Sequence, residues 1–103
     1  MADKATVGRI LHYTIKSGDL AGDRMVGEAR PAIVVKVWPN EYPAENKTTD
    51  GNGHALVGDG YNVQVLLDGT NDTAAIGQAC LWRTSLAICD EPTPGHLSWP
   101  PRV

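Results

Sequence analysis

The feature that most constrains the fold of this chain is a period-two alternation of apolar residues in short runs. In the segment 61–67 every second residue from Tyr61 to Leu67 is apolar, and Asn62 and Gln64 lie between them. Successive side chains of a β-strand point to opposite faces, so this pattern predicts a strand with one buried face. The 11 glycines and 7 prolines separate such runs. The chain is therefore expected to be built from strands and turns.

Three further runs predict strands. In segment 7–15 the odd-numbered residues are apolar, with Arg9 as the exception. They are Val7, Leu11, Tyr13 and Ile15. Segment 32–38 follows Pro31, and both its odd-numbered and its even-numbered positions hold apolar residues. This pattern predicts a strand that is covered on both faces. The strand is expected to start at Pro31 and to end at Pro39. Segment 79–88 is the fourth candidate.

These strands predict an all-β fold, a small barrel or sandwich of four to six strands, with an SH3-like barrel as the best single match. Long loops are expected at 20–30 and 40–60, where periodicity is lost. Residues 1–90 are expected to form the β-rich domain. Residues 91–103 are expected to form a Pro-rich, extended tail that runs over the surface and packs on this domain or on a partner.

Charge and composition exclude several classes of protein. The net charge is −3, and the basic residues are spread along the chain, so nucleic-acid binding, which needs clustered cations, is not expected. No apolar run approaches the length of a membrane span, and the first residues lack the pattern of a secretory signal, which predicts a cytoplasmic protein. Cys80 and Cys89 lack metal-ligand spacing and are expected to pack in the core, although a disulfide is an alternative.

The sequence contains no recognisable constellation for catalysis or for metal binding. His12, His54 and His96 lack the short spacing of a zinc site. The segment 50–61 starts like a calcium loop but lacks its required glycine and its final glutamate. Carboxylate pairs such as Asp19 with Asp23 stand beside turn residues and indicate turns. We therefore expect no enzymatic activity, no cofactor and no metal.

The aromatic residues are tryptophans and tyrosines only, which is typical of contact surfaces because each offers apolar area with a polar group. Trp82 and Tyr61 lie inside predicted strands and are expected to belong to the core. Trp38 and Trp99 stand beside prolines at segment ends and are the better interface candidates. The predicted partner-binding residues are Trp38, Trp99, Pro100 and Arg102.

Five segments of the chain have a familiar sequence: 8–13, 30–35, 62–72, 81–85 and 94–100. Together they resemble a family of small proteins without an assigned activity that tailed phages and prophages of Gram-negative bacteria encode. The resemblance implies a viral role. The acidic balance, the absence of a catalytic site and the Pro-rich tail around Trp99 favour a structural protein that decorates or cements the phage capsid. Such a protein is expected to bind a major capsid protein and to be found in the host cytoplasm during infection and then in the virion.

An alternative of another class is a non-enzymatic anti-defence protein that sequesters a host signalling nucleotide between protomers. Polar and basic residues that could contact such a ligand beside stacking aromatics support this alternative. They are Arg30, Asn62, Gln64, Asn71 and Arg83. Both hypotheses predict a homo-oligomer, since segment 33–38 is apolar on both parities and a small core cannot easily cover it.

Overall fold

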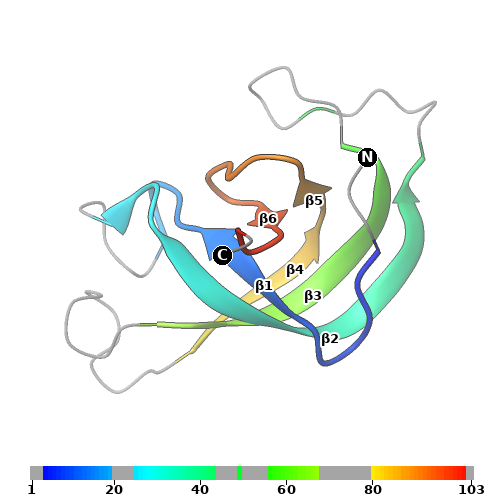
Figure 1. Ribbon diagram of the computed structural model, residues 1–103, viewed down its shortest axis with the longest axis horizontal. Coiled ribbons are helices and arrows are strands. Elements are labelled where there is room, and N and C mark those ends of the chain that lie inside the picture. The colour runs from blue at the N-terminus through cyan, green and yellow to red at the C-terminus, as the bar shows by residue number, and fades with distance from the viewer. Residues whose placement is uncertain (1–3, 20–24, 44–48, 50–55, 68–79, 102–103) are drawn as a thin grey trace.

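The computed structural model describes residues 4–19, 25–43, 49, 56–67 and 80–101. The alternating segments form one six-stranded sheet in the order β4-β3-β2-β1-β6-β5 (Figure 1). Its strands are β1 (Ile10–Thr14), β2 (Ala29–Tyr42), β3 (Gly58–Leu66), β4 (Cys80–Leu86), β5 (Ile88–Cys89) and β6 (Leu97–Ser98).

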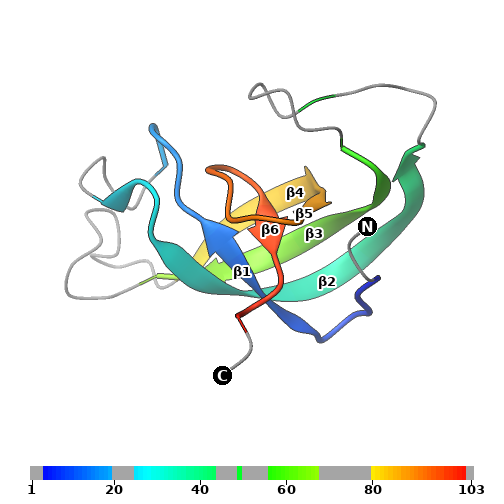
Figure 2. The ribbon, with the colours of Figure 1, turned by 45° about the horizontal axis from the view of Figure 1, so that its top comes forward.

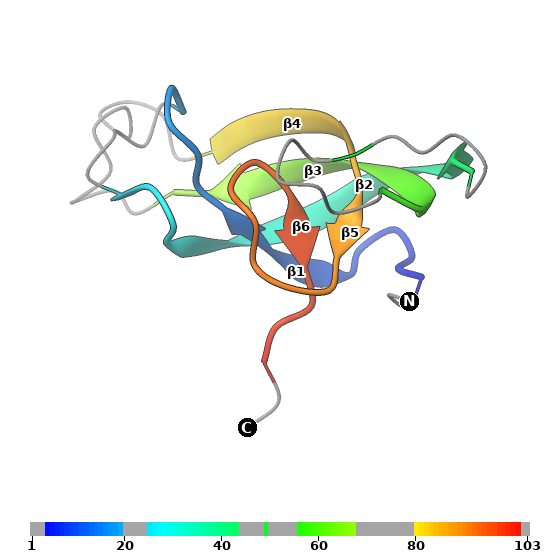
Figure 3. The same ribbon diagram turned by 90° about the horizontal axis from the view of Figure 1, so that it is seen from above.

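The predicted all-β class is confirmed, and the sheet curls without closing. Strands β1 to β4 form an antiparallel meander, and β6 returns to pair with β1. Strands β5 and β6 lie on the concave side of the curved ribbon of β2 and β3 (Figures 1 and 3). The radius of gyration is 13.2 Å, as expected for a folded domain of this length. The described ranges contain no α-helix, and so none that could cross a membrane.

One row across the sheet and the alternation along β3 show how core and surface residues are separated. The register places Leu11, Ala32, Val65 and Leu81 side by side across β1 to β4, and all four are buried. Tyr61 and Val63 of β3 are also buried, whereas Asn62 and Gln64 point away, as the alternation predicts. The core therefore lies on the concave side of the sheet.

The start of the chain differs from the prediction at Val7. Its side chain is exposed, because a turn at residues 7 and 8 precedes β1 and Arg9 N–H donates to the carbonyl of Thr6. Gly8 adopts the left-handed conformation that this turn requires (φ 92°). Strand β1 consequently begins only at Ile10.

Strand β2 is longer than predicted and passes through both prolines. It starts at Ala29, inside the expected first loop, and continues through Pro39 to Tyr42. Its pairing with β3 shifts register between Trp38 and Tyr42, and such a bulge accommodates a residue that lacks an N–H. The expectation that both faces of this strand are covered is wrong, since Val35 and Trp38 are exposed.

The C-terminal segment is part of the sheet. Leu97 pairs with Tyr13 of β1 and with Ile88 of β5, and both Leu97 and Ser98 are buried (Figure 2). The expectation that the extended segment packs on the domain agrees with these contacts, whereas the expectation that it runs over the surface is wrong for Leu97 and Ser98, which are buried. Cys80 and Cys89 are half-buried thiols, which agrees only in part with the expected core packing.

Candidate functional site

A row of three apolar residues and one glutamine crosses the convex side of the sheet, and most of it is exposed among the described residues. The register aligns Ile10, Ile33, Gln64 and Trp82 across β1 to β4. Ile10 is 54% exposed and Trp82 is 49% exposed. Leu66 of β3, which lies two residues beyond Gln64, is also exposed. We call the surface formed by these residues and Trp38 the outer face.

Trp38 is held in place on the outer face by its neighbours. Its indole Nε1–H donates to Asn62 Oδ1 at 3.0 Å, and Lys36 Nζ lies 4.9 Å from the centroid of its ring. The side chain is nevertheless 43% exposed. With its polar group already satisfied inside the protein, Trp38 presents its ring to solvent in a fixed orientation.

Asn62 also fixes the corner at which the chain turns from β4 to β5. Its Oδ1 accepts the Ser85 N–H at 3.0 Å, and Tyr42 OH donates to the Ser85 carbonyl at 2.5 Å. Ser85 needs this support because its φ of 57° lies in the left-handed region, which is unfavourable for a residue other than glycine. Asn62 was predicted as a ligand contact, and in the structure it joins Trp38 to this corner.

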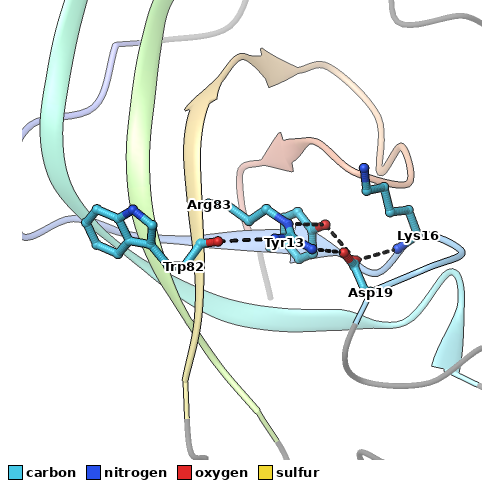
Figure 4. A network of polar contacts seen from close by, with 5 residues as sticks. All are labelled: Tyr13, Lys16, Asp19, Trp82 and Arg83. Atoms are coloured by element: carbon cyan, nitrogen blue, oxygen red, sulfur yellow. Dashed lines mark hydrogen bonds and ion pairs between the residues drawn. The ribbon is translucent and has the colours of Figure 1, made fainter. Parts of the chain in front are cut away.

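On the other side of β4, three side chains from two distant parts of the sequence form a largely buried polar network (Figure 4). The Asp19 carboxylate accepts a hydrogen bond from Tyr13 OH at 2.6 Å and forms an ion pair with the Arg83 guanidinium. Asp19 Oδ2 also accepts the Lys16 N–H at 2.9 Å. The Asp19 side chain is fully buried, while that of Arg83 is 26% exposed.

The network shifts the pKa of each of its members. Burial raises the pKa of Tyr13 to about 12, and the hydrogen bond to Asp19 contributes in the same direction. Burial alone would raise the pKa of Asp19, but the hydrogen bonds from Tyr13, Lys16 N–H and Arg83 lower it below its ordinary value. Burial opposes the charge of Arg83, but its bonds to Tyr13 and Asp19 raise the pKa of the guanidinium. Asp19 and Arg83 are therefore both charged at neutral pH.

An open pocket of about 460 Å³ lies between the turn that follows β1 and strand β4. We call it the Arg83 pocket, and its described lining consists of Lys16, Ser17, Gly18, Trp82, Arg83, Thr84 and Leu86. Lys16 and Arg83 are both cations, and none of these residues carries a carboxylate. A volume of this size is ordinary for a small-molecule site.

The structure divides the residues predicted to contact a nucleotide between two faces. Asn62 and Gln64 lie on the outer face, whereas Arg83 points to the concave side. Arg30 lies near the start of β2, where its Nη1 donates to Glu28 Oε1 at 3.1 Å and to the Ala29 carbonyl at 3.0 Å. Asn71 lies outside the described residues. The described members of this set do not line one pocket in a single chain.

The residues predicted to bind a partner are similarly divided. Trp38 is exposed on the outer face, but Trp99 is half-buried and packs against the core, with the Arg9 guanidinium 5.0 Å from its ring centroid. Pro100 is half-buried, and Arg102 lies outside the described residues.

The prediction that Trp82 belongs to the core is wrong, whereas Tyr61 is buried as predicted. In strand β4 it is Leu81 and Arg83 that face inward, so Trp82 must face outward. The apolar odd-numbered residues of β3 indicate which face of that strand is buried, and β4 pairs directly with β3. The sequence does not give the register of this pairing, and the register decides whether Trp82 faces inward or outward.

Lys16, the Tyr13–Asp19 bond and the Arg83 pocket were also not anticipated. Asp19 was assigned to turn chemistry, and it does close a turn, since its N–H donates to the Lys16 carbonyl at 3.2 Å. Its ion pair with Arg83 joins residues 64 positions apart, a separation at which periodicity gives no information. Among the described residues, no group of three His, Cys, Asp or Glu side chains could hold a metal ion.

Comparisons with known proteins leave the function to be inferred from these two surfaces. No family model, no curated protein and no solved structure matches the chain. The outer face and the Arg83 pocket are therefore the features on which a proposal can rest.

Proposed function

We propose that this protein is a non-enzymatic structural protein of a tailed phage that decorates the capsid, with its outer face as the contact surface. The observation that carries the proposal is the exposed apolar row on the convex side of the sheet, with Ile10 and Trp82 about half exposed. Large apolar side chains exposed close together in this way are typical of protein–protein contact sites.

The composition of the outer face supports a specific contact. Tryptophan is enriched among the residues that contribute most to binding energy, and Trp38 and Trp82 are both available. The bond from Trp38 to Asn62 fixes the ring before a partner arrives, which reduces the entropy lost on binding. Lys36 and Gln64 add polar groups beside the apolar residues, as expected of a contact surface that is exposed to water before the partner binds.

The edge of strand β4 and the exposed apolar area on β2 support assembly of the chain into a homo-oligomer, which would bind a major capsid protein. Strand β4 is an edge of the sheet within the described residues, and proteins usually cover or blunt such edges. Exposed Trp38 and Val35 on β2 supply apolar area that the core of one chain does not cover. The protein would then be located in the host cytoplasm during infection and afterwards in the virion.

Purified virions of the phage that encodes the chain provide the first test. Mass spectrometry should detect the protein in many copies per particle, because a decoration protein follows the capsid lattice. Detection in infected cells with only a trace in virions would end the capsid proposal.

Attachment variants provide the second test, on the same particles. Trp82→Ser should weaken binding to capsids that lack the protein by about thirtyfold, the effect of losing a central interface tryptophan. Val26→Ser, which also removes an exposed apolar side chain but lies in the turn before β2, is the control. Equal binding by both variants would exclude the outer face as the contact surface.

The second candidate function is sequestration of a host signalling nucleotide, and Arg83 is the observation that favours it. Arg83 belongs to the predicted nucleotide-binding set and lines an open pocket. Asn62 and Gln64 lie across the sheet, so a site that uses all of these residues would have to form between protomers. Calorimetry with a panel of cyclic nucleotides tests this candidate, and absence of binding to all of them would exclude it.

A further inference from the structure

We infer that the Arg83 pocket binds the phosphate group of a small phosphorylated ligand, with Lys16 and Arg83 as its cationic contacts. The inference is independent of capsid attachment. It deepens the second candidate, because it names the part of a ligand that this chain can recognise without a second protomer.

The charge of the pocket is opposite to that of the whole chain. The chain has a net charge of −3, yet the two charged side chains in the described lining are Lys16 and Arg83. Asp19, the acid of the network, has a fully buried side chain that is already bonded to Tyr13, Lys16 N–H and Arg83. The Lys16 ammonium has no partner among the described residues, so its positive charge remains available to a ligand.

Arg83 is oriented by the protein and keeps donors available. Its Nε, Nη2 and Nη1 point to Tyr13 OH, Asp19 Oδ1 and the Trp82 carbonyl, respectively. A guanidinium has more N–H groups than these three bonds use, and the side chain is partly exposed. Planar guanidinium groups fixed in this way bind phosphate oxygens with two parallel hydrogen bonds. Ser17 and Thr84, which both carry hydroxyls, are also among the residues that line the pocket.

The pocket is suited to a phosphate but not to base stacking. Trp82 lies on the opposite side of β4 from Arg83, as Figure 4 shows, so its ring does not face the guanidinium. Tyr13, the aromatic residue nearest Arg83, is fully buried. Recognition within one chain is therefore expected to depend on the phosphate, and a base would add little affinity.

The test is a titration of the intact protein with inorganic phosphate, ribose 5-phosphate and adenosine 5′-monophosphate, at constant ionic strength, with acetate as the reference anion. Amide chemical shifts report the position of binding, and calorimetry reports the affinity. We expect the amide signals of Ser17, Gly18 and Thr84 to move, with similar dissociation constants for the three phosphates and no comparable effect of acetate.

Variants separate the pocket from general attraction between charges. Lys16→Gln should weaken phosphate binding about tenfold, as expected for the loss of one charge-assisted contact, and it should fold normally because Lys16 is exposed. Lys36→Gln removes the same charge from the outer face and should bind phosphate like the parent protein. Arg83→Lys retains the charge but loses the planar geometry and should also bind more weakly, with thermal unfolding used to show that it is folded.

Absence of shifts at the pocket, or equal losses in the Lys16 and Lys36 variants, would overturn the inference. Binding of all three phosphates would support it even if cyclic nucleotides fail to bind, so the failure of the nucleotide function remains distinguishable. Whether the protein is incorporated into virions does not affect the phosphate titration or the comparison of the variants.

Discussion

Replacing Arg83 by methionine should reveal how much the buried Asp19 carboxylate depends on its partner. Methionine fills a similar volume but offers no charge and no N–H donor. The Asp19 side chain would remain fully buried and would retain only Tyr13 OH and Lys16 N–H as donors. A buried carboxylate that loses its counter-ion destabilises the folded state strongly.

The magnitude follows from the burial of the two partners. Breaking a fully buried ion pair costs about 3–5 kcal/mol, and the partial exposure of Arg83 places this pair at the lower end, near 3 kcal/mol. Asp19→Asn removes the charge but retains an oxygen that can accept from Tyr13. The double variant should therefore lose about 1–3 kcal/mol less than the sum of the two single losses.

Urea unfolding followed by tryptophan fluorescence measures these free energies. The interaction energy between Asp19 and Arg83 is obtained from the double-mutant cycle of the parent protein, the two single variants and the double variant. The pKa of Asp19 is lowered on folding, so its ionic contribution is complete above about pH 4 and is lost as pH falls through the folded pKa. The deficit of Arg83→Met should accordingly shrink in acid. A deficit below about 0.5 kcal/mol, or strictly additive single losses, would refute the reasoning.

Two further predictions concern other parts of the core. Leu97→Ala should lower the free energy of unfolding by about 3 kcal/mol, because Leu97 is fully buried. A chain that ends at Asp90 lacks β6 and should fail to fold. A truncated chain that circular dichroism shows to be stably folded would contradict the position of β6. The pKa of Tyr13 is raised from 10.0 to about 12, so its contribution is complete below pH 10 and is lost as pH rises toward 12. The difference in stability between the parent protein and Tyr13→Phe should therefore narrow over this range, and a constant difference would exclude the raised pKa.

Segments with a regular period were the part of the fold that the sequence alone predicted well. The alternation from Tyr61 to Val65 gave the correct inward face of β3, because a strand with one buried face must alternate. The all-β class followed from the same patterns. Boundaries were less accurate, since a bulge allowed β2 to continue through Pro39.

The two-residue strand β6 and the contacts of β4 could not be predicted in this way. A strand as short as Leu97–Ser98 has no period to detect. In β4, Trp82 and Arg83 are neighbours with opposite faces, and apolarity alone assigned the tryptophan to the core. Arg83 faces inward because Asp19 neutralises its charge there and Tyr13 OH accepts a hydrogen bond from it, and both partners lie more than 60 residues away in sequence.

The register of β4 connects the two candidate surfaces. Because side chains alternate along a strand, a shift of one residue would turn Trp82 inward and Arg83 outward and so abolish both surfaces together. The ion pair with Asp19 holds one side of the strand, and Asn62 holds Ser85 at its end. Asn62 also orients Trp38, so the contacts that set the register arrange the outer face as well. The polar residues at these positions thus have a structural reason to be present, and variants that preserve them, such as Trp82→Ser and Lys16→Gln, are the suitable probes of function.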